Sequence, residues 1–261
     1  MDPGQQTRRT VRLGDHEVTR IGLGTNRLTD TPAHGAFVRD AADAGIQLID
    51  TAHTYTGGDS ERTIGGAFGA DRGSVLVATK GGFGPGNGSP GMLRDQIEES
   101  LRRLRVETID LYYLHRVDPQ TPLEDSLRTI RQFVDRGRIR LVGLSQVGIE
   151  EIEQARAVVP IAAVQNHYNL RERRWDPVVD FCARQGIVFA PYFPLREVAG
   201  PEVARVAARH GVTSSQVALA WLLGRSPAML PIPGSLSLDH VRENLAALDL
   251  ALSSDDLDEL G

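Results

Sequence analysis

Short apolar runs recur along the chain, and amphipathic stretches separate them. The runs do not alternate apolar with polar residues, which is typical of strands that are buried on both faces in a parallel sheet. Eight segments are therefore predicted strands: Ile21–Leu23, Leu48–Ile49, Val75–Ala78, Ile109–Leu114, Leu141–Leu144, Ala162–Val164, Ile187–Ala190 and Met229–Ile232.

Between these runs, apolar residues return every three or four positions, as they do on the core-facing side of a helix. The stretches 93–104 and 123–134 show this spacing most clearly. Capping boxes at the start of a helix are predicted at Thr121–Glu124, where a proline holds the second position, and at Thr213–Gln216 and Ser253–Asp256.

Strict alternation of strands and helices leaves a doubly wound sheet or a closed barrel. The length of 261 residues suits the barrel, and no break in composition divides the chain. Residues Thr10–Val18 are predicted to form a hairpin that plugs the N-terminal end of the barrel. We therefore predict an α/β fold, with residues 1–261 forming a single (β/α)8 TIM barrel domain.

The composition narrows the class of protein. Hydrophobic residues make up 41% and charged residues 24%, as in a globular protein. The net charge of −5 argues against a nucleic-acid partner. Cys182 is the only cysteine, which suits a reducing compartment. No run approaches the ~18 apolar residues of a membrane span, and Met1–Arg12 lacks the apolar stretch of an export signal. We expect a cytoplasmic protein without a membrane partner, either a monomer or a weak homo-oligomer.

Arginine and lysine occur in very unequal numbers. The chain has 28 arginines but only one lysine, Lys80. A GC-rich genome explains the arginines but not the exception. Lysine offers a compact ammonium whose pKa the surroundings can tune, so Lys80 is a candidate for a specific chemical role.

Polar residues follow several predicted strands, at the barrel end where active sites lie. Asp50 ends the second strand, Tyr55 lies in the loop after it, Lys80 ends the third strand and His115 ends the fourth. Each residue alone has a structural explanation, as a helix cap, a loop aromatic or a core imidazole. Together with the single lysine they predict a reactive site.

The chemistry that suits this set is proton delivery to a carbonyl. A tyrosine phenol has an ordinary pKa near 10, and an adjacent ammonium lowers that pKa. A carboxylate holds the ammonium in place, and an imidazole can orient the carbonyl oxygen or relay a proton. None of these groups attacks the substrate, and no redox metal ligands are evident. A nicotinamide hydride is therefore the expected electron donor, without a metal.

The chain resembles the aldo-keto reductase superfamily over essentially its whole length. The resemblance rests on the segments Gly22–Asn26, Leu48–Tyr55, Val77–Lys80, Asp110–His115, Val142–Ser145, Val164–Asn169 and Ile232–Ser235, with Glu243–Asn244. It implies a catalytic tetrad of Asp50, Tyr55, Lys80 and His115, with Tyr55 as the general acid.

The resemblance also implies that NADP(H) binds in an extended form across the rim, without a Rossmann fold. Ser145 and Gln165 are expected at the nicotinamide carboxamide, and Tyr192 against its ring. Gln146 is also expected there, although many family members have asparagine at its position. Gly24, Thr25 and Asn26 are expected along the ribose, and Asp50 is also expected to contact the cofactor. Leu195 and Arg196 are expected at the pyrophosphate. Ser235 and His240 are expected at the 2′-phosphate, and Glu243 and Asn244 at the adenine.

Two departures from the family pattern affect the cofactor. Gly234 and His240 stand where better-studied members have lysine and arginine, so we expect NADPH to be preferred over NADH by a narrow margin. Arg242 is a candidate substitute for these cations. The loop Arg116–Thr121 is brief and the chain ends at Gly261, so we expect an open rim that accepts a range of small aldehydes and ketones.

The substrate stays open among pyridoxal, a sugar-derived ketone and a generalist role. Three segments look most like a bacterial branch with pyridoxal reductase-like proteins: Val164–Asn169, Pro191–Leu195 and Gln216–Leu223. Pyridoxal would lie beside Phe83, Phe193 or Tyr192.

Two other functions are alternatives to carbonyl reduction. A metal-dependent barrel hydrolase could use His53, His115 and His167, but it needs three or four ligands in fixed geometry. A non-catalytic regulatory barrel is the second alternative. The glycine-rich segment Gly86–Gly91 matches a dinucleotide-binding pattern, but it begins too far after its strand and contains Pro90, so we interpret it as a flexible rim loop.

Overall fold

The computed structural model describes residues 9–69 and 71–261 of the chain. Its central feature is a curled parallel sheet in which each strand pairs with the next along the chain. The strands of this sheet are β3 (Leu23–Gly24), β4 (Leu48–Asp50), β5 (Leu76–Gly81), β6 (Ile109–Leu114), β7 (Ile139–Ser145), β8 (Ile161–Gln165) and β9 (Val188–Phe189).

The predicted eighth strand closes the ring as an extended segment rather than as a regular strand. Residues 229–234 form parallel bridges to β9 on one side and to β3 on the other. The carbonyls of Pro231 and Pro233 accept hydrogen bonds from Gly22 (3.0 Å) and Gly24 (3.1 Å). Because proline has no N–H to donate in return, a complete ladder cannot form here. The closed α/β barrel is confirmed, with this irregular seam.

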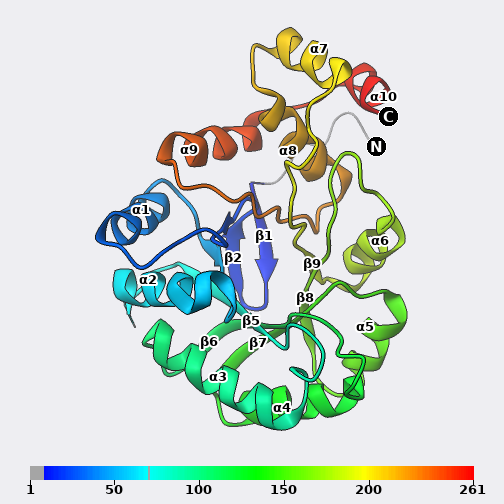
Figure 1. Cartoon of the computed structure of the whole chain (residues 1–261). Helices are drawn as coiled ribbons and strands as arrows, with labels where there is room; N and C mark the ends of the chain where they lie inside the picture. The colour runs from blue at the N-terminus through cyan, green and yellow to red at the C-terminus, as the bar shows by residue number, and fades with distance from the viewer. Residues whose placement is uncertain (1–8, 70) are drawn as a thin grey trace.

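Helices surround the sheet (Figure 1). They are α1 (Pro32–Asp43), α2 (Asp59–Phe68), α3 (Pro90–Leu104), α4 (Leu123–Asp135), α5 (Ile149–Arg156), α6 (Asp176–Gln185), α7 (Pro201–His210), α8 (Ser214–Arg225), α9 (Leu238–Ala246) and α10 (Ser254–Leu260), with 3-10 turns η1 (Tyr55–Gly58) and η2 (Ala247–Asp249). The helix faces predicted from apolar spacing pack inward, as α3 shows with Leu93, Ile97, Leu101 and Leu104, all buried.

Two of the three predicted capping boxes are confirmed, at Thr213 for α8 and at Ser253 for α10. The prediction at Thr121 is wrong, because α4 begins at Leu123 and Pro122 occupies the N-cap position. Thr121 instead belongs to the turn before the helix, where its hydroxyl donates to the Asp118 carboxylate (2.9 Å).

The predicted N-terminal hairpin forms from β1 (Thr10–Leu13) and β2 (His16–Thr19), which pair antiparallel. Leu13 and Val18 are fully buried in a cluster that includes Leu48 and Leu76, the first residues of β4 and β5. The hairpin thus covers the N-terminal end of the barrel, across the centre of the ring in Figure 1.

Within residues 9–69 and 71–261, no helix is both long and apolar enough to cross a membrane. The expectation that the N-terminus lacks an export signal falls largely on residues 1–8, which lie outside the described residues.

Candidate active site

Lys80 lies at the centre of a hydrogen-bonded group at the C-terminal end of the barrel. It stands near the end of β5, and no part of its side chain is exposed. Its Nζ donates to Oδ1 of Asp50 (2.5 Å), to the Thr51 carbonyl oxygen (2.7 Å) and to the Tyr55 hydroxyl (3.2 Å). An ammonium has three N–H donors, so all three are used. Since the Tyr55 oxygen accepts from Lys80, the phenol proton is directed elsewhere.

Asp50 and Lys80 form a buried ion pair whose two charges depend on each other. The second carboxylate oxygen of Asp50 accepts a hydrogen bond from Nε2 of Gln165 (2.8 Å). Burial raises the pKa of Asp50, and the charge of Lys80 opposes that rise. Burial alone would lower the pKa of Lys80, but Asp50 and Tyr55 outweigh it and raise that pKa above its ordinary value. Lys80 therefore remains protonated.

His115 directly follows β6 and is kept neutral by its surroundings. Burial, together with the charges of Lys80 and Arg116, lowers the pKa of His115 to about 2. Its ring lies edge-on to Tyr55, with 6.1 Å between centroids, and 4.8 Å from Phe83. Its buried Nδ1 has no hydrogen-bond partner among the described residues. A neutral imidazole offers one donor and one acceptor, so His115 has hydrogen-bonding capacity to spare.

The loop that carries Tyr55 is tied to the strand that carries Lys80. Arg103 of α3 donates to the His53 carbonyl oxygen (2.9 Å) and forms an ion pair with buried Glu61 (3.2 Å). Glu61 also accepts from the hydroxyl of Thr79 (2.6 Å), the residue before Lys80. This chain of contacts links the segment that leads into Tyr55 to the strand that carries Lys80.

A cavity of about 760 Å³ opens above these residues. Asp50, Tyr55 and His115 line it, whereas Lys80 lies beneath its wall and touches it through Tyr55. The predicted cofactor residues in its lining are Gly24, Thr25, Asn26, Asp50, Ser145, Gln165, Tyr192, Leu195 and Arg196.

Five predicted cofactor residues lie outside this lining: Gln146, Ser235, His240, Glu243 and Asn244. Oε1 of Gln146 accepts from the backbone N–H of His167 (2.8 Å), and the Glu243 carboxylate accepts from the Thr213 hydroxyl (2.6 Å). Their assignment to the cofactor stays a prediction.

The cavity has the chemistry that an extended dinucleotide requires. A side chain at Gly24 would place its Cβ 2.8 Å from a backbone oxygen, so only glycine fits this wall. Ser145 and Gln165 offer polar groups to an amide, and the Tyr192 ring offers an aromatic face. Arg27 and Arg196 supply cations for phosphates. These residues fit NADP(H).

The glycine-rich loop after β5 binds a carboxylate of the protein itself. The N–H groups of Gly86 and Gly88 donate to Asp118 at 3.0 and 2.9 Å. These amides are therefore not available to a phosphate. The flexibility of this rim loop stays a prediction, and two of its backbone amides are bound by Asp118.

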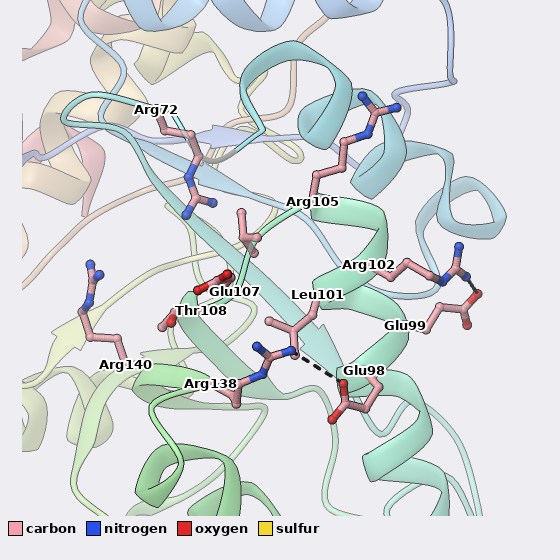
Figure 2. Close-up of a pocket in the computed structure, with 11 residues that line it drawn as sticks. Arg72, Glu98, Glu99, Leu101, Arg102, Arg105, Glu107, Thr108, Arg138 and Arg140 are labelled. Carbon is pink, nitrogen blue, oxygen red and sulfur yellow. Dashed lines mark hydrogen bonds and ion pairs between the residues drawn. The ribbon is translucent and has the colours of Figure 1, made fainter.

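A second hollow, of about 970 Å³, lies where β6 and β7 begin, at the opposite end of the barrel. Figure 2 shows arginines around it with Glu107 and Thr108 between them. Most of these arginines already contact carboxylates: Arg72 and Arg140 with Asp110, Arg102 with Glu99, and Arg138 with Glu98. Their charge is largely compensated, and none of the predicted catalytic residues lies here.

The metal-hydrolase alternative finds no support in the arrangement of possible ligands. Over the described ranges, no group of three or more His, Cys, Asp and Glu side chains is placed to hold a metal ion. His53 contacts Arg103 and Glu99, whereas His167 stacks on Tyr192.

Arg116 was not predicted as a site residue, yet its side chain lines the cavity beside His115. It is one of 28 arginines, and only its place directly after a strand end could have singled it out.

Comparisons with known proteins identify relatives of this chain in both sequence and fold. The model of the "Aldo/keto reductase family" matches residues 20–199 and 197–261. An uncharacterized oxidoreductase of Schizosaccharomyces pombe is 38% identical, over 97% of this chain and 90% of that protein. Pyridoxine 4-dehydrogenase of Escherichia coli is 33% identical over 96% of each. The structure of an aldo/keto reductase from Klebsiella pneumoniae in complex with NADP and acetate has a TM-score of 0.87 and 31% identity, covering 97% of this chain and 94% of that one.

Proposed function

The chain belongs to the aldo/keto reductase family, and we propose that it is an NADP(H)-dependent oxidoreductase that reduces aldehydes and ketones to alcohols. The observation that carries this proposal is the contact of Lys80 with both Asp50 and Tyr55 at the base of the cavity.

Tyr55 is the proposed proton donor. Its oxygen accepts from Lys80, so its own proton is free to reach a carbonyl oxygen bound in the cavity. As that proton leaves, negative charge develops on the phenol oxygen, and the ammonium at 3.2 Å stabilises it. Asp50 acts as a positioning residue, because it holds Lys80 charged and aimed at Tyr55.

His115 is proposed to orient the substrate. Its neutral ring cannot supply a full positive charge, but it can donate a hydrogen bond to the carbonyl oxygen from the nitrogen that faces the cavity. Tyr55 and His115 would then define the position of that oxygen between them.

NADP(H), when bound, supplies the hydride. Ser145, Gln165 and Tyr192 would hold its nicotinamide end, and Gly24, Arg27 and Arg196 its ribose and pyrophosphate. The NADP-bound Klebsiella relative supports this cofactor. Ser235, His240, Glu243 and Asn244 remain our proposal for the 2′-phosphate and the adenine.

The substrate is proposed to be a small carbonyl compound, for which pyridoxal is one candidate. The relative named pyridoxine 4-dehydrogenase supports that candidate. Phe83 and Phe193 are both about half exposed beside the cavity, where they could flank an aromatic aldehyde.

The test is oxidation of NADPH, and of NADH in parallel, with pyridoxal, methylglyoxal, 4-nitrobenzaldehyde and keto-sugars. We expect turnover of at least one aldehyde, faster with NADPH. Binding of NADPH without turnover of any carbonyl compound would favour the non-catalytic regulatory barrel instead.

A further inference from the structure

We propose that Arg116 is a substrate-binding residue that selects carbonyl compounds carrying a carboxylate. This inference rests on the proposed reductase function and adds the class of substrate to it.

The charge of Arg116 has no acidic partner in the described part of the chain. Its Nη1 donates to the His115 carbonyl oxygen (2.6 Å) and to the Ser145 hydroxyl (3.0 Å). Both of these partners are uncharged. A guanidinium has five N–H donors, so capacity remains for an anion.

The acidic residue nearest in sequence is already occupied. Asp118 follows Arg116 by two positions, but its carboxylate accepts from Gly86, Gly88, Gln120 and Thr121, and it lies in no ion pair with Arg116. The chain therefore places a carboxylate close by and directs it away from this guanidinium.

Three other partly buried arginines of the barrel are neutralised by carboxylates. Arg72 contacts Asp110, Arg103 contacts Glu61, and Arg225 contacts Asp180. Arg116 differs from these three, because its hydrogen-bond partners are a backbone carbonyl and a hydroxyl and because it lines the cavity.

The walls beside Arg116 suit a planar carboxylate. Its guanidinium carbon lies 5.6 Å from the centre of the Phe83 ring and 5.8 Å from that of Tyr192. Aromatic walls reduce the access of water, which strengthens a charge-assisted hydrogen bond. A planar guanidinium binds a carboxylate through two parallel hydrogen bonds. Because His115 precedes Arg116, a substrate held here would have its carbonyl near His115 and Tyr55.

The kinetic test compares 2-, 3- and 4-carboxybenzaldehyde with their neutral methyl esters, using NADPH. The measured quantity is the ratio of kcat/KM for each acid over its ester. We expect a ratio of at least about 10 for the isomer that fits best. The difference should lie mainly in KM, which should be lower for the acid than for its ester. Arg116→Gln should reduce this ratio about tenfold or more, because the loss of one hydrogen bond to a charged group weakens binding by about that factor. Arg116→Lys should restore part of it.

Arg39→Gln is the matched control, since it removes the same charge from an exposed position on α1. It should keep the parental ratio. A second arm measures binding of 4-methylbenzoate, which has no hydroxyl to be oxidised, to the NADP-saturated protein by titration calorimetry, where Arg116→Gln should weaken binding about tenfold. This arm requires no turnover, so it separates a failure of Arg116 from a failure of the reductase function.

Three results would overturn the proposal. The first is a parental acid-to-ester ratio no greater than one for all isomers. The second is a ratio that Arg116→Gln leaves unchanged. The third is a loss of NADPH affinity in Arg116→Gln as large as the loss for the acid, which would make Arg116 a cofactor contact.

Discussion

Replacing Lys80 by arginine keeps the positive charge but should abolish most activity. Lys80 places a single nitrogen 2.5 Å from Asp50, 2.7 Å from the Thr51 oxygen and 3.2 Å from Tyr55. A guanidinium spreads its donors over a plane, and a carboxylate binds two of them side by side. Arginine would therefore pair with Asp50 and lose the geometry at the phenol.

The size of the loss follows from the space available. The Lys80 side chain is completely buried, so a wider head must displace a neighbour. Of the three acceptors, the Tyr55 hydroxyl makes the longest and therefore weakest contact, so Tyr55 is the residue expected to move. A displacement of about 1 Å can reduce the rate about 100-fold, equivalent to about 2.7 kcal/mol in the activation free energy.

The assay is single-turnover reduction of 4-nitrobenzaldehyde, with circular dichroism as the control for folding. Lys80→Met is the companion variant, and it should also lose stability, by roughly 3–5 kcal/mol, because it leaves Asp50 buried without its counter-charge. Activity of Lys80→Arg within a few-fold of the parent would refute the reasoning, because any cation would then suffice.

Two further predictions concern stability. His115 titrates near 6.5 when unfolded but near 2 when folded, so the unfolded state takes up the proton first as pH falls below 6.5. This residue should lower the free energy of unfolding by about 1.5 kcal/mol between pH 6.5 and 5. In urea unfolding, His115→Gln should lose that part of the pH dependence. An equal pH dependence in the two proteins would count against a neutral His115. Gly65→Ala should destabilise the protein by roughly 1–3 kcal/mol, because its Cβ would lie against the backbone oxygen of Arg103, while Gly66→Ala, with nothing within 4 Å of its Cβ, should stabilise it by roughly 0.5–1 kcal/mol. Thermal unfolding that shows the same sign for both would contradict this packing of α2 on α3.

The sequence predicts the barrel well because its signals are local. Apolar runs and helical spacing locate the strands and helices, and they need no knowledge of distant contacts. Prediction is weaker where a distant or competing group decides. Pro231 and Pro233 make the eighth strand irregular, and Thr121 lies in a turn bound to Asp118, so the helix begins after Pro122 rather than at the predicted cap.

The residues of the candidate site likewise include some that local sequence patterns predict and some that depend on distant contacts. Asp50, Tyr55 and His115 follow predicted strands, and Lys80 is conspicuous as the single lysine, so the group could be predicted before its geometry was known. Arg116 could not, because its proposed role depends on the lack of an acidic partner among the described residues, and Asp118 is instead bound by Gly86, Gly88, Gln120 and Thr121. The position of Gln146 outside the cavity lining likewise accompanies its contact with the backbone of His167.

The central claim is that Tyr55 delivers the proton to the carbonyl oxygen, and Tyr55→Phe tests it most directly. The change removes one hydroxyl and leaves the ion pair of Asp50 and Lys80 in place. Single-turnover kinetics should show a fall in the rate of carbonyl reduction of about 10²–10⁴-fold, while the Kd for NADPH stays within a few-fold of the parent. A variant that keeps more than about a tenth of the parental rate would contradict the account, since general acid catalysis by Tyr55 could not then be the source of the activity.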